Sequence, residues 1–445
     1  MALQLDDARA RHRRAREDYD AFRSRGLKYD MRKGWPSAEQ LDLSSALLGL
    51  PGSDDYTTES GHDARQYSGL QGLPELRAIF APILGVPVEQ LVAADNSSLA
   101  LMHDALVYAL LWGVPGGDGP WVREVREARG MREVREVREA REVRRFLCPV
   151  PGYYWHFALA EACGFDLIPV PLTGQGPDME VVERLALDPS VKGMWCVPQY
   201  ANPSGETYSD ETVRRLAGMR TGAADFRLFW DDAYPLHHLT STPRRVANIL
   251  VASTEAGHPR RPLLFTSTSK ITFAGAGVGF FAGCPENVRW YLDHAGRRSI
   301  GPDKINQLRH VRFLKSEAET RRLMDQHRRC LSPKFEALDE VLHQHLHGEA
   351  GVGWTRPEGG YFTLLTVVPG TAGRVVELAK EAGLLLSPAG SLHPHGVDPE
   401  DKLIRLAPSQ PSVAEIRAIA AGIALCVRLA LRESELKQLT PERTI

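Results

Sequence analysis

The chain has 445 residues, a formal net charge of −2 and an apolar content of 43%, values typical of a globular protein with two or three domains and a large core. The near-neutral charge argues against a nucleic-acid partner, no apolar run approaches a membrane span, and the first thirty residues lack the apolar core of a signal peptide. The six cysteines are scattered without a CxxC pair, so we expect a reduced, cytoplasmic protein without a metal site.

The N-terminal part of the chain predicts helices separated by turns. Residues 5–26 are charged and predict a helix that ends near Gly26, and Pro74 suits the first turn of a later helix. A short strand is expected at 91–93, followed by Asn96-Ser97-Ser98 and a helix over 99–112. Such residues cap helices, and free amides at the same place can bind a phosphate. A plain cap is the commoner role of such residues, so the motif leaves both readings open.

Residues 121–145 interrupt this pattern with repeated Arg-Glu-Val triplets. A period of three does not match the helical period of 3.6, so the valines do not form one apolar face. We interpret this segment as a charged, solvated insertion without chemistry of its own. A partner-binding helix is the alternative reading.

After the insertion, apolar runs alternate with amphipathic stretches such as 155–164 and 210–219. Alternation of this kind predicts an α/β fold with a mainly parallel sheet covered by helices, and ligands then bind at the carboxyl ends of the strands. The apolar runs that we interpret as strands are 146–150, 166–172, 191–198, 226–230, 262–266 and 278–282.

Lys270 follows one of these runs, beside the small hydroxyl residues of Thr266-Ser267-Thr268-Ser269 and before a glycine-rich turn. Burial disfavours the charged form of a lysine, and a neutral amine is a nucleophile that can form a Schiff base. Ser267 and Ser269 are compact donors suited to phosphate oxygens. An exposed lysine in an ordinary turn is the alternative reading of this motif alone.

Polar residues follow several other runs. Tyr153, Asn202 and the Asp231-Asp232-Ala233-Tyr234 motif each come just after a predicted strand. An aromatic ring, an amide, a carboxylate with a phenol and a lysine suit a flat, charged, heteroaromatic cofactor that binds covalently. From about 311 onward the chain predicts a long helix to near 347, strands near Gly359 and 403–407, and a last helix from 413 to about 431.

Taken together, the motifs resemble those of a known family. They occur in this order: Tyr67 with Gly72, Asn96-Ser97-Ser98, Tyr153, Asn202-Pro203-Ser204-Gly205, Asp231-Asp232-Ala233-Tyr234, Ser267-Thr268-Ser269-Lys270 and Arg405. The pattern resembles fold-type-I pyridoxal-phosphate aminotransferases, and the class Ic bacterial aspartate aminotransferase group most closely. The resemblance implies a mainly parallel seven-stranded sheet in a large domain and a smaller α+β domain. We place the boundaries at 1–50 (N-terminal helix and turn, part of the small domain), 51–315 (large cofactor-binding domain, with the 121–145 insertion) and 316–445 (C-terminal small domain).

The resemblance also implies residue roles. Lys270 would form the Schiff base with pyridoxal 5'-phosphate and move the substrate's proton, and Asp231 would pair with the pyridinium nitrogen. Arg405 would bind the substrate α-carboxylate, with Gly34 and Trp35 at the substrate end. The other implied cofactor contacts are Tyr234 and Asn202 to the ring hydroxylate, Tyr153 stacked on the ring, Asn96, Ser97, Ser98, Ser267 and Ser269 at the phosphate, and Tyr67 reaching the phosphate of the other subunit of a homodimer.

The chain departs from the family at the substrate end. Trp35 replaces a lysine in a Gly-Lys-Pro-Ser turn, and Tyr154-Trp155 replace an Asp-Arg pair. Aromatic surface in place of charge argues against aspartate as the substrate, because a side-chain carboxylate needs a cationic partner. The family's phosphate-binding arginine is also missing at Ala276-Gly277-Val278, and the sequence does not identify its replacement.

Two enzymatic hypotheses follow from the resemblance. The first is transfer of an amino group from an L-amino acid to a 2-oxo acid. The alternative is β-elimination at a sulfur-bearing amino acid, or decarboxylating deamination, on the same scaffold. A ligand-sensing regulator is a third class, but the N-terminal helix is too short for a helix-turn-helix module.

Overall fold

The computed structural model describes residues 2–67, 69–122 and 143–440. Residues 123–142, which make up most of the predicted insertion, lie outside the described part. None of the described helices combines the length and the apolar character needed to cross a bilayer.

The largest sheet has seven strands in the order β2-β8-β7-β6-β5-β3-β4. β8 runs antiparallel to both of its neighbours, and the other neighbouring pairs are parallel, so the predicted mainly parallel α/β sheet is confirmed. The strands are β2 (Leu91–Ala94), β3 (Arg145–Val150), β4 (Asp166–Pro171), β5 (Val191–Cys196), β6 (Arg227–Asp231), β7 (Pro262–Ser267) and β8 (Gly279–Ala282).

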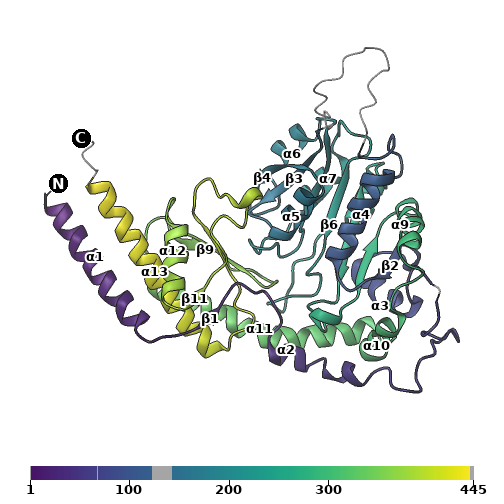
Figure 1. The fold of residues 1–445 in the computed structure, drawn as a ribbon, viewed down its shortest axis with the longest axis horizontal. Helices are drawn as coiled ribbons and strands as arrows, with labels where there is room; N and C mark the ends of the chain where they lie inside the picture. Colours follow the sequence, from purple (N-terminus) through teal and green to yellow (C-terminus); the bar gives the residue numbers. More distant parts are fainter. Residues whose placement is uncertain (1, 68, 123–142, 441–445) are drawn as a thin grey trace, which may run out of the picture.

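Helices cover both faces of this sheet (Figure 1). Successive residues of a strand pack in different hydrophobic cores. Leu228 packs with the helices on one face of the sheet, and Phe229 packs with the helices on the other face. Burial on both faces explains why the strands read as continuous apolar runs. One face carries α3 (Pro74–Leu84), α6 (Met179–Leu185), α7 (Asp210–Gly218), α8 (Ile249–Glu255) and α10 (Lys304–Leu314), and the other carries α4 (Ser98–Trp112), α5 (Tyr154–Ala162) and α9 (Pro285–Arg298).

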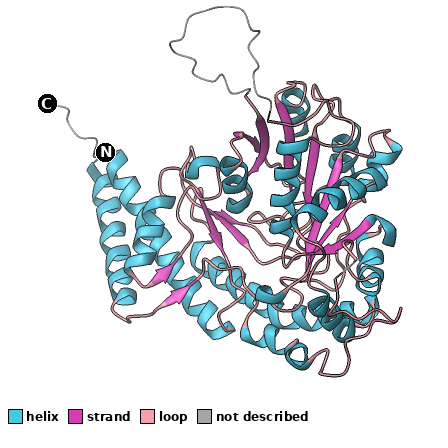
Figure 2. Ribbon diagram, turned by 45° about the vertical axis from the view of Figure 1, so that its right-hand side comes forward, coloured by secondary structure: helices cyan, strands magenta, loops and turns pink. Residues whose placement is uncertain are grey.

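A second region holds short strands and long helices (Figure 2). β10 (Thr363–Thr366) lies between β9 (Gly353–Trp354) and β12 (Leu403–Leu406) with antiparallel pairing, and β1 (Tyr29–Asp30) pairs in parallel with β11 (Leu384–Leu385). These strands share an apolar core with α1 (Ala2–Arg23), α11 (Glu317–Leu346), α12 (Ala372–Glu381) and α13 (Val413–Leu439). The remaining short elements are α2 (Ala38–Asp42) and the 3₁₀ helices Ser45–Gly49, Val88–Gln90, Ala274–Ala276 and Pro394–Gly396.

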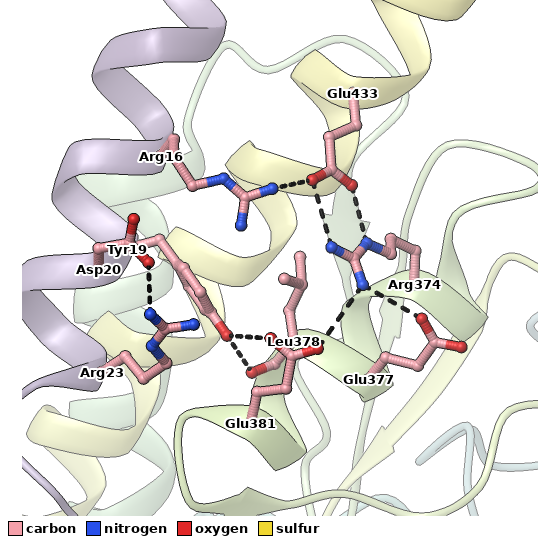
Figure 3. A network of polar contacts seen from close by, with 9 residues as sticks. All are labelled: Arg16, Tyr19, Asp20, Arg23, Arg374, Glu377, Leu378, Glu381 and Glu433. Atoms are coloured by element: carbon pink, nitrogen blue, oxygen red, sulfur yellow. Dashed lines mark hydrogen bonds and ion pairs between the residues drawn. The ribbon is translucent and has the colours of Figure 1, made fainter.

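The first helix packs on the last one, and α1 lies along α13 (Figure 1). Glu433 accepts hydrogen bonds from Arg16 at 2.5 Å and from Nε of Arg374 at 2.8 Å (Figure 3). The fully buried Tyr19 donates from its hydroxyl to the carbonyl of Leu378 at 2.9 Å. Side chains from α1, α12 and α13 therefore meet here. The domain boundaries given above stay a prediction.

One predicted helix is wrong. The sequence predicted a single helix over 311–347, whereas α10 ends at Leu314 and α11 begins at Glu317. Lys315 adopts a left-handed backbone with φ of 60°, and the Ser316 hydroxyl accepts a hydrogen bond from the Glu319 amide at 3.2 Å. This hydroxyl therefore caps α11 as a separate helix.

Candidate active site

A cavity of about 440 Å³ opens where β6 and β7 end, at the carboxyl edge of the sheet. It brings together every predicted site residue except Asn96 and Tyr67: Gly34, Trp35, Ser97, Ser98, Tyr153, Asn202, Asp231, Tyr234, Ser267, Ser269, Lys270 and Arg405. Residues from the whole length of the chain therefore meet at one place, as expected for a ligand site at strand ends.

Asp231 ends β6 and is 4% exposed. Its Oδ2 lies 3.0 Å from Nε2 of His156, whose ring stacks on Trp195 with 4.4 Å between ring centroids. Its Oδ1 is buried and has no hydrogen-bond partner among the described residues. Because an unpaired buried carboxylate oxygen is costly, this atom calls for a donor inside the cavity, and a protonated ring nitrogen fits.

Lys270 follows β7, with Nζ 5.1 Å from the centroid of the Tyr234 ring. Burial lowers the pKa of this ammonium group, while the charge of Asp231 acts in the opposite direction. The net lowering makes the neutral, nucleophilic amine easier to form.

Small hydroxyl residues also line the cavity. Ser97 caps α4 by accepting from the Ala100 amide at 3.3 Å, and Ser267 donates to the Ser269 hydroxyl at 2.9 Å. A helix N-terminus beside three serine hydroxyls (Ser97, Ser267, Ser269) suits a phosphate group.

Two predicted residues lie outside the cavity. The backbone carbonyl of Asn96 faces the glycine turn, where a Cβ on Gly277 would lie only 2.9 Å from that oxygen. Tyr67 is 75% exposed on the surface of the chain. Their predicted roles toward the cofactor stay predictions.

Arg405 is held in place from several sides. Its Nη1 donates to Oδ1 of Asn202 at 3.2 Å, its Nη2 donates to the carbonyl of Arg32 at 2.9 Å, and its guanidinium lies 4.7 Å from the centroid of the Phe362 ring. The buried Nε has no hydrogen-bond partner among the described residues. A fixed guanidinium with a free donor is suited to a carboxylate.

Tyr153 lines the same cavity as the Asp231 carboxylate. Burial, and then the charge of Asp231, raise the pKa of Tyr153 to about 12. The phenol therefore stays neutral and presents an uncharged ring to the cavity.

The sequence analysis missed a basic pair at the rim. Arg32 and Lys33 both line the cavity, and Nζ of Lys33 lies 4.4 Å from the centroid of the Trp35 ring. Asp30 pairs with Arg32 at 2.8 Å and lies 3.8 Å from Lys33. The conclusion that aromatic surface had replaced charge is therefore incomplete, because the aromatic ring of Trp35 holds a neighbouring lysine.

Two further residues were missed. Phe362 packs so tightly on Gly34 that a Cβ at Gly34 would lie 2.3 Å from the ring, which explains the glycine. His156, the partner of Asp231, lies in the first turn of α5, three residues after Tyr153. Its position in the helix that follows the predicted aromatic residue was the only signal. The described residues contain no group of three His, Cys, Asp or Glu side chains arranged to hold a metal ion.

Comparison with known proteins assigns the family. The sequence pattern of the family described as aspartate amino-transferase matches residues 3–439. A putative aminotransferase of Mycolicibacterium smegmatis is 48% identical over 98% of each chain. An aspartate aminotransferase of Corynebacterium glutamicum is 46% identical over 95% of this chain and 94% of its own.

Solved structures agree. The crystal structure of an aspartate transaminase from Corynebacterium glutamicum is 44% identical, covers 96% of this chain and 97% of its own, and superposes with a TM-score of 0.91. An α-aminoadipate aminotransferase from Thermus thermophilus, at 21% identity, 93% and 94% coverage and a TM-score of 0.68, shares the fold. The resemblance inferred from the motifs is thus confirmed: this chain is a fold-type-I aminotransferase and belongs to the aspartate aminotransferase family.

Proposed function

We propose that the chain uses pyridoxal 5'-phosphate to move an amino group from a dicarboxylic L-amino acid to a 2-oxo acid. The observation that carries this proposal is the unpaired, buried Oδ1 of Asp231 in the same cavity as Lys270. A pyridinium N–H supplies the missing donor, and an amine with a lowered pKa suits an aldehyde-bearing cofactor.

The residues around the cavity would hold this cofactor from three sides. Ser97, Ser267 and Ser269 would bind its phosphate, while Tyr153 would cover one face of its ring. Tyr234 and Asn202 would donate to the oxygen on the ring. When bound, pyridoxal phosphate supplies an electron sink for the bond that breaks at the substrate α-carbon.

The chain's own groups then perform the positioning and the proton transfer. Arg405 would bind the α-carboxylate, and its contacts with Asn202 and Phe362 fix where that carboxylate lies. From that position the amine of Lys270 would accept the proton of the substrate α-carbon and donate it to the bound cofactor. Asp231, kept in orientation by His156, would hold the ring charge that favours this step.

A dicarboxylic donor is favoured by the charge of the cavity. Four basic residues line it, Arg32, Lys33, Lys270 and Arg405, whereas the nearby carboxylates are Asp231 in the lining and Asp30, which pairs with Arg32 and lies 3.8 Å from Lys33. A second substrate carboxylate near Lys33 would offset this excess. The related chain from Corynebacterium glutamicum is named an aspartate aminotransferase. The β-elimination or decarboxylating alternative receives no support from the relatives.

We also propose a cytoplasmic homodimer. The six cysteines are all unpaired, as in a reducing compartment. Tyr67 is exposed and outside its own cavity, a position from which it would reach the phosphate of a second subunit.

The test is titration of the purified protein with single amino acids while the cofactor absorption is followed. We expect a dicarboxylic amino acid to remove the absorption band of the cofactor bound to Lys270, and a 2-oxo acid to restore it. Lys270→Ala should abolish both turnover and that absorption band. Release of thiol, ammonia or carbon dioxide in place of reversible amino transfer would reject the proposal.

A further inference from the structure

A second cavity lies at the opposite edge of the same sheet. It has a volume of about 340 Å³, within the range of small-molecule sites. Arg227 begins β6 and Arg261 directly precedes β7, whereas Asp231 and Ser267 end those two strands beside the first cavity. The two cavities are therefore separated by the length of the strands.

The ionisable side chains that line this second cavity are all basic. Its lining contains no aspartate or glutamate, and its basic members are Arg220, Arg227, His258, Arg260 and Arg261. The rest of the wall is apolar or small, with Met219, Phe226 and Pro259 among its members. Like charges gathered without a carboxylate repel one another, so the arrangement is favourable only when an anion is present.

Two of the arginines are buried and fixed. Arg227 is 2% exposed, and its Nη1 donates to the Phe226 carbonyl at 3.0 Å. Arg261 donates from Nη1 to the carbonyls of Leu216 and Ala217 at the end of α7, at 3.1 and 2.6 Å. These carbonyl partners fix the guanidinium groups without forming a salt bridge to them.

One donor in this cluster is unsatisfied. Nε of Arg227 is buried and has no hydrogen-bond partner among the described residues. The pKa of Arg227 is lowered to about 10, chiefly by burial and also by the charges of Arg260 and Arg261, while the charge of Asp225 acts in the opposite direction. Asp225 itself is paired with Lys192 at 3.0 Å. Arg227 therefore stays charged at neutral pH, with a buried donor and no carboxylate of its own.

The other two arginines lie at the mouth. Arg260 lies against Gly116, where an added Cβ would be 2.8 Å from its guanidinium carbon. Within the described residues, neither Arg220 nor Arg260 forms a salt bridge. Glu286 acts on Arg260 by charge alone and lies outside the lining. Both guanidinium groups are thus available to a ligand.

We propose that this cavity is a binding site for a small anion carrying two or more phosphate groups, separate from the active site. A planar guanidinium group can bind two phosphate oxygens at once. Four guanidinium groups carry more positive charge than one phosphate monoester would neutralise. The apolar wall of Met219 and Phe226 accommodates the uncharged part of such a molecule. This site is independent of the proposed substrate and cofactor.

Calorimetric titration with inorganic pyrophosphate tests the proposal. The protein should be saturated with its cofactor, so that the active-site phosphate position is occupied, and held at physiological ionic strength to suppress weak surface binding. We expect one pyrophosphate bound per chain. The double variant Arg220→Gln, Arg260→Gln should weaken binding by about one to two orders of magnitude, the value of lost charge-assisted hydrogen bonds.

A matched control separates this site from general charge. The double variant Arg13→Gln, Arg14→Gln removes the same charge from exposed positions on α1 and should leave the affinity unchanged. The cofactor absorption spectrum should be the same in all three proteins. Absence of pyrophosphate binding, equal weakening in both double variants, or tighter binding of citrate than of pyrophosphate would overturn the proposal.

Discussion

Lys33 offers the sharpest test of the substrate assignment. Replacement by methionine keeps the length and apolar stem of the side chain and removes its charge. Lys33 lines the active-site cavity, but its side chain is 41% exposed, so water screens its charge. A buried charge-assisted contact is worth about 1.5–3 kcal/mol and an exposed pair about 0.2–1 kcal/mol. We therefore expect a loss of about 1 kcal/mol for Lys33→Met, or roughly fivefold in kcat/KM for a dicarboxylic donor.

The assay is the half-reaction, because it needs no 2-oxo acid that Lys33 would also bind. Loss of cofactor absorption is followed after mixing with L-aspartate or with L-2-aminobutyrate, which is similar in size and lacks the second carboxylate. Lys33→Met should slow the first and leave the second unchanged. Lys28→Met, at an exposed position outside the cavity, serves as the control. Equal slowing with both donors, or no change with aspartate, would refute the reasoning.

Three further predictions concern positioning and stability. His156→Phe keeps a ring against Trp195 but removes the hydrogen bond to Asp231, and should lower kcat/KM about tenfold for both donors. Glu433→Gln weakens the pairs with Arg16 and Arg374 and should lower the free energy of unfolding by about 1 kcal/mol, measured by urea denaturation. Glu206→Gln should stabilise the protein above neutral pH, with no effect near pH 4, as measured by melting temperature against pH.

The sign of the Glu206 effect follows from burial. Burial raises the pKa of Glu206 to about 7, against the opposing hydrogen bond from the Gly176 amide. Between about pH 4 and pH 7 the unfolded chain loses this proton while the folded chain keeps it, so stability falls as pH rises. Glutamine removes that loss, which amounts to about 3 kcal/mol for a pKa raised from 4.5 to about 7. A melting temperature whose pH dependence is unchanged by Glu206→Gln would contradict this account.

The predictions for His156→Phe and Glu433→Gln each have a result that would contradict them. If His156→Phe leaves kcat/KM unaltered, the orientation of Asp231 does not depend on the His156 ring. If Glu433→Gln leaves the unfolding free energy unchanged, the network of Figure 3 adds nothing to the packing of α1 on α13.

The sequence by itself determined the sheet and the centre of the active site. Strands buried on both faces are mostly apolar, so β5, β6 and β7 were recognisable as apolar runs. Lys270 and Asp231 stood out because a charged residue directly after such a run has few structural reasons to be there.

Only the tertiary structure decided what surrounds those residues. Lys33 and His156 are polar residues in ordinary local contexts, and their roles depend on contacts with Trp35 and with Asp231, the latter 75 positions further along the chain. The second cavity has the same origin, because Arg220, Arg227 and Arg260 lie in separate loops and strand starts that only the folded sheet brings together. Local patterns record the burial of each segment, whereas the choice of partner between distant segments is set by packing, which one sequence does not display.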